Sequence, residues 1–413
     1  MSTIAEIKRE KLFIVPEPVA TRAEAPAKES LQSSLRRNRA AVGLVFFLHG
    51  LCFASWASRI PTIQANLHLT SSALGAVLFA LPAGFFISLP FAGWLVGRLG
   101  SKRVVIVAAV LYSLALVCVG ASSTVLALVC CLFCFGFFAN LLNISINTQA
   151  VVVERLYQQK LMATFHGLWS LAGFTGAAMG TWMMAHAVPP AHHYILICVI
   201  FLLVIGTCAF YLVSQDDVAG EKLPLFALPD RALISLGLIA FCSMIAEGAM
   251  FDWSGVYFSN VVHVDASYTG LGYTTFMIAM AGMRFVADRF SARFGLTRIL
   301  QVSGLLTTVG LLIVVLFPSL LPSLAGFFLI GMGVSSVVPL VFSAAGKSKT
   351  LSPGVAIAAV SSLGFMGMLI GPPIIGFIAE ATSLRMSFLA LLVLSVSVVV
   401  LSSVRARSAS GAE

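Results

Sequence analysis

The chain has 413 residues, of which 59% are hydrophobic and 10% are charged, and its formal net charge is +9. Soluble domains carry roughly 25% charged residues, so this chain has too few to cover a water-facing surface, which excludes ordinary soluble enzymes and disordered chains. Its apolar stretches run for about 20 residues without alternation, which excludes a transmembrane barrel and indicates a polytopic helical membrane protein.

Twelve apolar stretches predict twelve membrane-spanning helices joined by short loops. The expected spans are 40–59, 71–97, 102–120, 124–152, 163–186, 194–213, 232–261, 268–290, 297–317, 321–346, 354–380 and 384–403. The region before the first span lacks an apolar core of signal-peptide length, so we expect a disordered tail. The predicted organisation is a tail at 1–38, a six-helix half at 39–213, a linker at 214–231, a second half at 232–404 and a tail at 405–413.

The distribution of lysine and arginine predicts the orientation. Twelve spans leave both chain ends on one side of the membrane, and all of these cations except Arg59 and Arg385 are assigned to that side. Positively charged loops stay in the cytoplasm, so we expect both termini there. The positive charge then faces anionic lipid of the bilayer, and no nucleic-acid partner is expected.

Signatures of catalysis and metal binding are absent from the sequence. All eight cysteines fall within predicted spans, and no pair has metal-ligand spacing with histidine partners. There is no Gly-Lys-Ser/Thr phosphate loop and no nucleophile–base–acid set. We therefore expect no enzyme activity, no cofactor and no metal.

The chain is an internal duplication. Residues 68–103 match residues 263–298, and residues 170–180 match residues 361–371. The two offsets are nearly equal, so one six-helix unit is doubled, and both copies have the same orientation in the membrane. Parallel repeats related by a pseudo-two-fold axis along the membrane normal are an architecture of transporters.

Two loops carry a family resemblance. The stretch Gly-Trp-Leu-Val-Gly-Arg-Leu-Gly-Ser-Lys-Arg at 93–103 resembles the loop between spans two and three of the major facilitator superfamily, and 293–298 is its second copy. More narrowly, four stretches resemble the fucose-permease-like branch and bacterial inner-membrane proteins of the YbjJ type: 56–61, 143–149, 165–170 and 247–254. The resemblance implies a monomeric twelve-helix carrier in a bacterial inner membrane.

The sequence departs from the superfamily pattern in two respects. The loop usually has an acidic residue where this chain has Gly97, and the second copy has Ala292 there. Proton-linked fucose permeases are also expected to carry carboxylates in spans one and four, which this chain lacks, so their coupling mechanism cannot be transferred.

The basic loop residues are candidate gates. They can reach helix C-terminal carbonyls and cytoplasmic acids, which would hold the outward-facing state, or they only set the topology. Asp288 is the candidate replacement for the missing loop acid. The basic candidates are Arg98, Lys102, Arg103, Arg289, Arg293 and Arg298.

Two carboxylates lie inside the seventh span. Glu247 is about 15 residues, or about 22 Å, into that span, near the membrane midplane. Burial disfavours its charged form, so Glu247 is expected to carry protons, to contact substrate or to make a structural bond, and no lysine or arginine is predicted at its depth. Asp252 lies nearer the far side, and we expect it to pair with Arg59 on span one as an external gate or a passive brace.

Other polar and aromatic residues predict a substrate cavity. Asn140, Asn143 and Asn147 share one face of span four by their helical spacing, which is typical of a cavity wall. His49 is a site residue or a packing residue, and His166 is a gate or a bond to span four. The remaining candidates are Trp56, Trp169 and Ser170 for a sugar-like ring, and Trp253 and Tyr257, which border the cavity or anchor the helix at the membrane interface.

These features together predict a secondary active transporter. The two halves would rock around a midplane site and move a small molecule, with a sugar or sugar-like solute favoured and protons as the coupling ion. The Phe-rich and Met-rich spans leave efflux of an amphipathic drug or metabolite open. A membrane receptor or scaffold that has lost transport is the alternative from another class.

Overall fold

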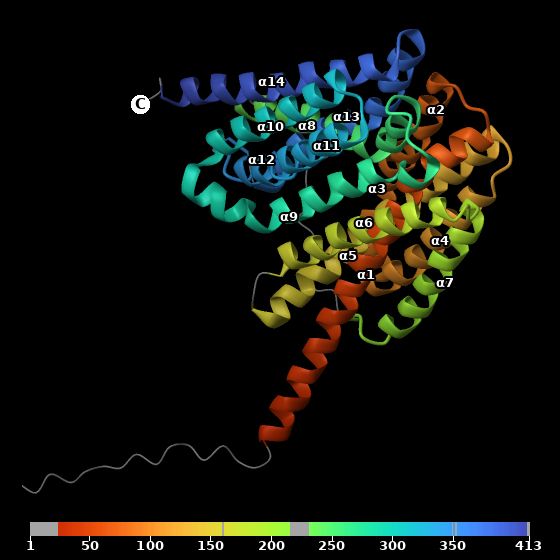
Figure 1. Ribbon diagram of the computed structural model, residues 1–413. Helices are drawn as coiled ribbons and strands as arrows, with labels where there is room; N and C mark the ends of the chain where they lie inside the picture. The colour runs from red at the N-terminus through yellow and green to blue at the C-terminus, as the bar shows by residue number, and fades with distance from the viewer. Residues whose placement is uncertain (1–23, 159–160, 215–230, 349, 352, 411–413) are drawn as a thin grey trace, which may run out of the picture.

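The computed structural model describes residues 24–158, 161–214, 231–348, 350–351 and 353–410, and these ranges are helical with no strand (Figure 1). The first half contains α1 (Glu24–Asn66), α2 (Ser71–Leu78), α3 (Ala80–Leu99), α4 (Ser101–Ala121), α5 (Val125–Tyr157), α6 (Met162–Ala185) and α7 (Pro190–Cys208). The second half contains α8 (Arg231–Asn260), η1 (Ala266–Tyr268), α9 (Leu271–Phe294), α10 (Leu296–Leu316), α11 (Leu320–Val334), α12 (Val337–Ala345), α13 (Pro353–Ala381) and α14 (Leu384–Ser410).

The described helices account for the twelve predicted crossings and confirm the all-α membrane fold. Helices α2 and α3 form one crossing, and so do α11 and α12. Ten crossings are long and apolar enough to span a membrane by composition, and the remaining two predicted positions are occupied by α6 and α9. Helix α9 is less apolar because three arginines and one aspartate lie in its second half.

The predicted tails are shorter in the structure than we expected. Helix α1 begins at Glu24, so residues 24–38 are helical and not part of a disordered tail. Helix α14 continues to Ser410, which includes most of the tail predicted at 405–413. The predicted linker lies outside the described residues except at its two ends.

Each half is a bundle of six crossings. In the first half, α1 packs on α6, and α5 packs on α3 and α4; in the second, α8 packs on α13, and α10 packs on α11 and α14. The halves meet chiefly through three helix pairs, α2 with α13, α6 with α9, and α1 with α8. Figure 1 shows that the two bundles converge near α2 and spread apart at the end where α14 finishes.

The backbone repeats the duplication seen in the sequence. His68 and His263 occupy matching turns and have left-handed φ values of 51° and 56°, which are uncommon for residues other than glycine. Gly100 and Gly295 also match, with φ values of 81° and 79°. Both halves therefore turn the chain with the same backbone conformation at the same positions.

The bundle has two ends: a distal end near α2 and a terminal end where α14 finishes. At the distal end, Glu380 of α13 accepts hydrogen bonds from the backbone N–H groups of Ser71 (3.0 Å) and Ser72 (3.4 Å) of α2. Gly75 lies against Gly376, where a side chain would collide with the opposing backbone. At the terminal end, α5 and α12 do not pack extensively among the described residues. The described parts of the two halves are thus in closer contact at the distal end than at the terminal end.

Candidate functional site

An ion pair between Glu247 of α8 and Arg284 of α9 lies in the middle of the protein. The distance from Arg284 Nη2 to Glu247 Oε1 is 3.4 Å, and Arg284 Nη1 donates a hydrogen bond of 2.8 Å to Ser170 Oγ of α6. The side chains of Arg284 and Glu247 are 25% and 13% exposed, respectively. Because Ser170 belongs to the first half, this group of three side chains bridges the two halves, and it is the one ion pair recorded among the described side chains.

Our expectation that no cation lies at the depth of Glu247 is wrong. The distribution of cations assigns Arg284 to the loop cations, although its position lies inside the predicted eighth span. Helix α9 packs against α8, and its middle reaches the level of Glu247. A carboxylate and a hydroxyl then stabilise a guanidinium that would be costly alone in the membrane interior.

An aromatic wall adjoins this ion pair. The Trp169 ring of α6 lies 6.2 Å from the Phe53 ring of α1, and Phe53 meets Phe251 of α8 edge-on at 5.4 Å across the interface. His49 is buried, lies 6.5 Å from Trp169 and meets Tyr112 edge-on at 5.4 Å. His49 therefore packs within the first half, behind the aromatic wall.

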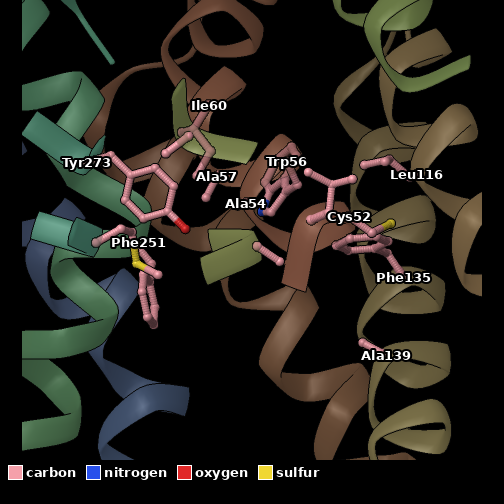
Figure 2. Close-up of a cluster of buried hydrophobic side chains, with 14 of the residues drawn as sticks. Cys52, Ala54, Trp56, Ala57, Ile60, Leu116, Phe135, Ala139, Phe251 and Tyr273 are labelled. Atoms are coloured by element: carbon pink, nitrogen blue, oxygen red, sulfur yellow. The ribbon is translucent and has the colours of Figure 1, made fainter. Parts of the chain in front are cut away.

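Two buried hydrogen-bond donors lie nearer the distal end. Figure 2 shows that Tyr273 of α9 points its hydroxyl toward α1, where Trp56 lies. Both side chains are buried, and neither Trp56 Nε1 nor Tyr273 OH has a hydrogen-bond partner in the described parts of the chain. Sequence reasoning included Trp56 but missed Tyr273, because a single tyrosine in an apolar run gives no periodic signal.

The asparagines of α5 do not act as one wall. Asn140 is buried, and its amide donates to Phe85 O (3.2 Å) and Ser88 Oγ (2.7 Å) of α3, so the prediction that it lines a cavity is wrong. Asn143 and Asn147 are half-buried, and Asn147 Nδ2 donates to Asn143 Oδ1 at 3.1 Å. The difference arises because α3 crosses α5 closely at Asn140 and leaves the next turns of α5 uncovered.

Trp253 and Tyr257 lie inside the second half, not along the cavity. Both are fully buried, and Tyr257 donates a hydrogen bond of 2.9 Å to Val314 O of α10. The Tyr257 ring lies 4.3 Å from the Phe388 ring of α14. Trp253 and Tyr257 therefore pack in the core of the second half, and neither borders the cavity or anchors the helix at the membrane interface.

The expected Arg59–Asp252 pair is not formed. Arg59 is buried, and its Nη2 donates a hydrogen bond to the Val188 carbonyl in the loop between α6 and α7. Asp252 is half-buried on α8 and has no ion pair recorded among the described side chains. The prediction failed because the guanidinium points toward its own half.

The candidate gating residues of the loops make local contacts. Arg98 lies over the Trp94 ring and Arg293 over the Phe294 ring, each at 5.4 Å, and Lys102 donates to Ser214 Oγ at 3.3 Å. Among the side chains that the structure describes, none of the gating cations pairs with an acid. The other candidates are Arg103, Arg298 and His166, which are exposed, and Asp288 and Arg289, whose side chains lie outside the described part of the chain.

Comparison with known families identifies the fold. The family model described as Major Facilitator Superfamily matches residues 42–350 and 236–411. The chain belongs to the major facilitator superfamily. It is therefore a multi-pass membrane transporter of that type, as the sequence resemblance indicated.

Relatives and solved structures agree with this assignment. The chain is 31% identical to an uncharacterized MFS-type transporter of Yersinia pestis over 86% of this chain and 92% of that protein. It is 32% identical to the membrane protein MosC of Rhizobium meliloti over 87% of this chain and 88% of that protein. The nucleoside transporter NupG superposes with a TM-score of 0.70 at 16% identity, covering 89% of this chain and 99% of NupG. The transporter FucP in its outward conformation gives 0.62 at 18% identity, covering 90% and 99% of the two chains, and at these identities the likeness shows the fold alone.

Proposed function

We propose that this protein is a proton-coupled secondary transporter of a sugar or sugar-like solute in a bacterial inner membrane, with both termini in the cytoplasm. The observation that carries the proposal is the central group in which Glu247 and Arg284 of the second half bond Ser170 of the first. A titratable carboxylate that helps to join two moving halves can couple proton binding to their relative position.

The coupling step follows from the chemistry of the ion pair. When Glu247 binds a proton, its attraction to Arg284 is lost, and the guanidinium is free to change partners. A low-dielectric surrounding strengthens the charge pair and penalises an unpaired charge. When the terminal end closes, two states of Glu247 are therefore favoured: ionised and paired with Arg284, or protonated and separated from Arg284. Opening to water allows the proton to leave, so the state of Glu247 and the accessible side of the membrane change together.

The side chains near the ion pair support a polar, ring-shaped solute. Asn143 and Asn147 offer amide groups from α5, and Trp169 offers an aromatic face from α6. Nearer the distal end, Trp56 Nε1 and Tyr273 OH are donors without a partner among the described residues. Amides and unpaired donors suit hydroxyl groups, and an aromatic face suits the apolar face of a sugar ring. The stretches at 56–61 and 247–254 support placement in the fucose-permease-like branch and among YbjJ-type proteins.

Efflux of an amphipathic compound is the second candidate. Phe85 and Phe86 of α3 meet Phe365 of α13 at 5.8 and 6.4 Å, so the interface between the halves also has a purely apolar aromatic surface. Such a surface suits a hydrophobic ring system better than a sugar. A receptor that has lost transport is the third candidate, favoured by Gly97 in place of the usual loop acid.

Transport in proteoliposomes tests the proposal. Purified protein is reconstituted, and an inward proton gradient is imposed while uptake of labelled monosaccharides and of amphipathic dyes is measured, with a protonophore as the control. We expect protonophore-sensitive accumulation of a sugar. Accumulation of dyes alone would support the efflux candidate, and no gradient-driven flux of either class would contradict transport and favour the receptor.

A further inference from the structure

A second cavity lies at the distal end, away from the central ion pair. Its volume is about 540 Å³, and both halves contribute to its wall. The polar lining residues are Arg59, Thr62 and Asn66 of the first half and Ser259 and Thr269 of the second. This volume falls in the range of about 300–1,000 Å³ that small-molecule sites occupy.

Arg59 is the one charged side chain among the described residues of the wall. The side chain is 1% exposed, and its single recorded hydrogen bond goes to Val188 O, while Nε and Nη1 have no partner in the described part of the chain. A buried guanidinium without a counter-charge is costly, since its water is not replaced by equally strong contacts. The wall therefore holds a positive charge with unused donors.

The groups around Arg59 supply no negative charge to compensate it. The described lining residues include no aspartate or glutamate. His193 of α7 is buried near Arg59, and neither of its ring nitrogens has a partner among the residues that the structure describes. Asp265 borders the cavity in sequence but is exposed, and Asp252 makes no ion pair with Arg59. The other polar lining groups are hydroxyls and one amide, which can donate hydrogen bonds to an anion.

From this geometry we propose that the distal cavity binds a small organic anion, with a carboxylate held at Arg59. Guanidinium–carboxylate contacts are short and charge-assisted. Nε and Nη1 of Arg59 are covered and have no partner among the described residues, so the guanidinium makes such contacts by turning toward the cavity. The cavity volume accommodates a molecule the size of a sugar acid. This site is distinct from the proposed transport site and lies at the opposite side of the aromatic wall from the terminal opening.

The cavity also links anion binding to conformation. Ser259, Ala266 and Thr269 come from the second half and Arg59 from the first, so the complete wall exists only while the distal end is closed. A ligand that binds one conformation stabilises it by its binding free energy. The anion therefore favours the conformation that is closed at the distal end and slows opening to that side.

Thermal unfolding of the purified full chain in detergent tests this site. Sodium gluconate is titrated against sodium chloride at constant ionic strength, with glucose as the uncharged control. We expect gluconate to raise Tm in a saturable manner and glucose not to reproduce the effect. No saturable shift beyond that of chloride would overturn the proposal.

Variants locate the binding and separate it from the transport site. Ser259→Asp places a negative charge in the wall from the opposite half without removing the Arg59–Val188 bond, and Ser259→Asn is its matched neutral control. We expect the gluconate shift to be lost in Ser259→Asp and Arg59→Gln and kept in Ser259→Asn and in Arg284→Gln, which removes the central cation. If Arg59→Gln does not fold, the Ser259 pair still decides. A shift that survives Ser259→Asp but disappears in Arg284→Gln would place the anion at the centre and contradict the distal site while leaving the transport proposal intact.

Discussion

The two halves share their turns and their closest helix crossing, but they differ in charge at the centre. In the first half Gly136 of α5 lies against Leu81 O of α3, and in the second Gly331 of α11 lies against the matching Phe276 O of α9. In contrast, Glu247 and Arg284 correspond by the duplication to the uncharged Cys52 and Leu89. Duplication has thus kept the residues that set the scaffold, whereas the titratable pair belongs to one half and reaches the other only through Ser170.

The variant expected to have the largest effect is Glu247→Gln, which removes the titratable group that only the second half carries. The variant mimics the protonated state, so it should retain substrate exchange while losing proton-driven accumulation by roughly tenfold or more. Counterflow and gradient-driven uptake in the same proteoliposomes provide the measurement. If the variant still concentrates substrate with wild-type pH dependence, Glu247 is a structural bond and the coupling role is wrong.

Removing the partner cation should destabilise the protein through the charge that remains. Breaking a buried pair costs about 3–5 kcal/mol, and because both side chains are partly exposed we expect about 1–3 kcal/mol for Arg284→Gln. The double variant Arg284→Gln/Glu247→Gln should recover most of that loss, since no uncompensated charge is left. Thermal unfolding of both single variants and the double variant gives the coupling. Additive losses would show that the two charges do not depend on each other.

Much of the fold could be predicted from sequence, because apolar runs, repeated motifs and the positions of cations indicate the number of spans, the duplication and the orientation. The central site was only partly predictable. Glu247 is recognisable as an acid in an apolar run, but its partner Arg284 lies near further cations, so the sequence pattern groups Arg284 with their loop. Asn140 and Asn143 share a helix face in sequence, and only the crossing with α3 decides that one is buried and the other is not. The packing of one helix against another decides which of these polar side chains is buried or paired, and local sequence patterns do not contain that information.

The shared crossing can be tested by exchanging residues between the halves. Gly84 of α3 corresponds to Ala279 of α9, and a Cβ at Gly84 would collide with the carbonyl of Phe133. Gly84→Ala should therefore lower the free energy of unfolding by about 1–3 kcal/mol, because α3 and α5 must separate. Gly93→Ala on the same helix is the control, since nothing lies within 4 Å of its added Cβ. Equal stability of the two variants would contradict the close crossing.

A smaller effect is expected where the first half has an extra bond between its helices. Asn140 of α5 bonds α3, whereas the matching Ser335 of the second half donates to Met332 O of its own helix segment. Asn140→Ser gives the first half the residue of the second and should lower the free energy of unfolding by about 0.5–2 kcal/mol, the range of such bonds between membrane helices.

Asn143→Ser is the matched control. Asn143 is half-buried, and the recorded bond of its side chain goes to Asn147 on the same helix, so the variant should change stability less. Because Asn143 lies in the open part of the interface, its variant should alter the apparent affinity for the transported solute, while Asn140→Ser should not. Thermal unfolding and concentration-dependent uptake of both variants separate the two roles, and the reverse pattern would restore Asn140 to the cavity wall that its helical spacing first suggested.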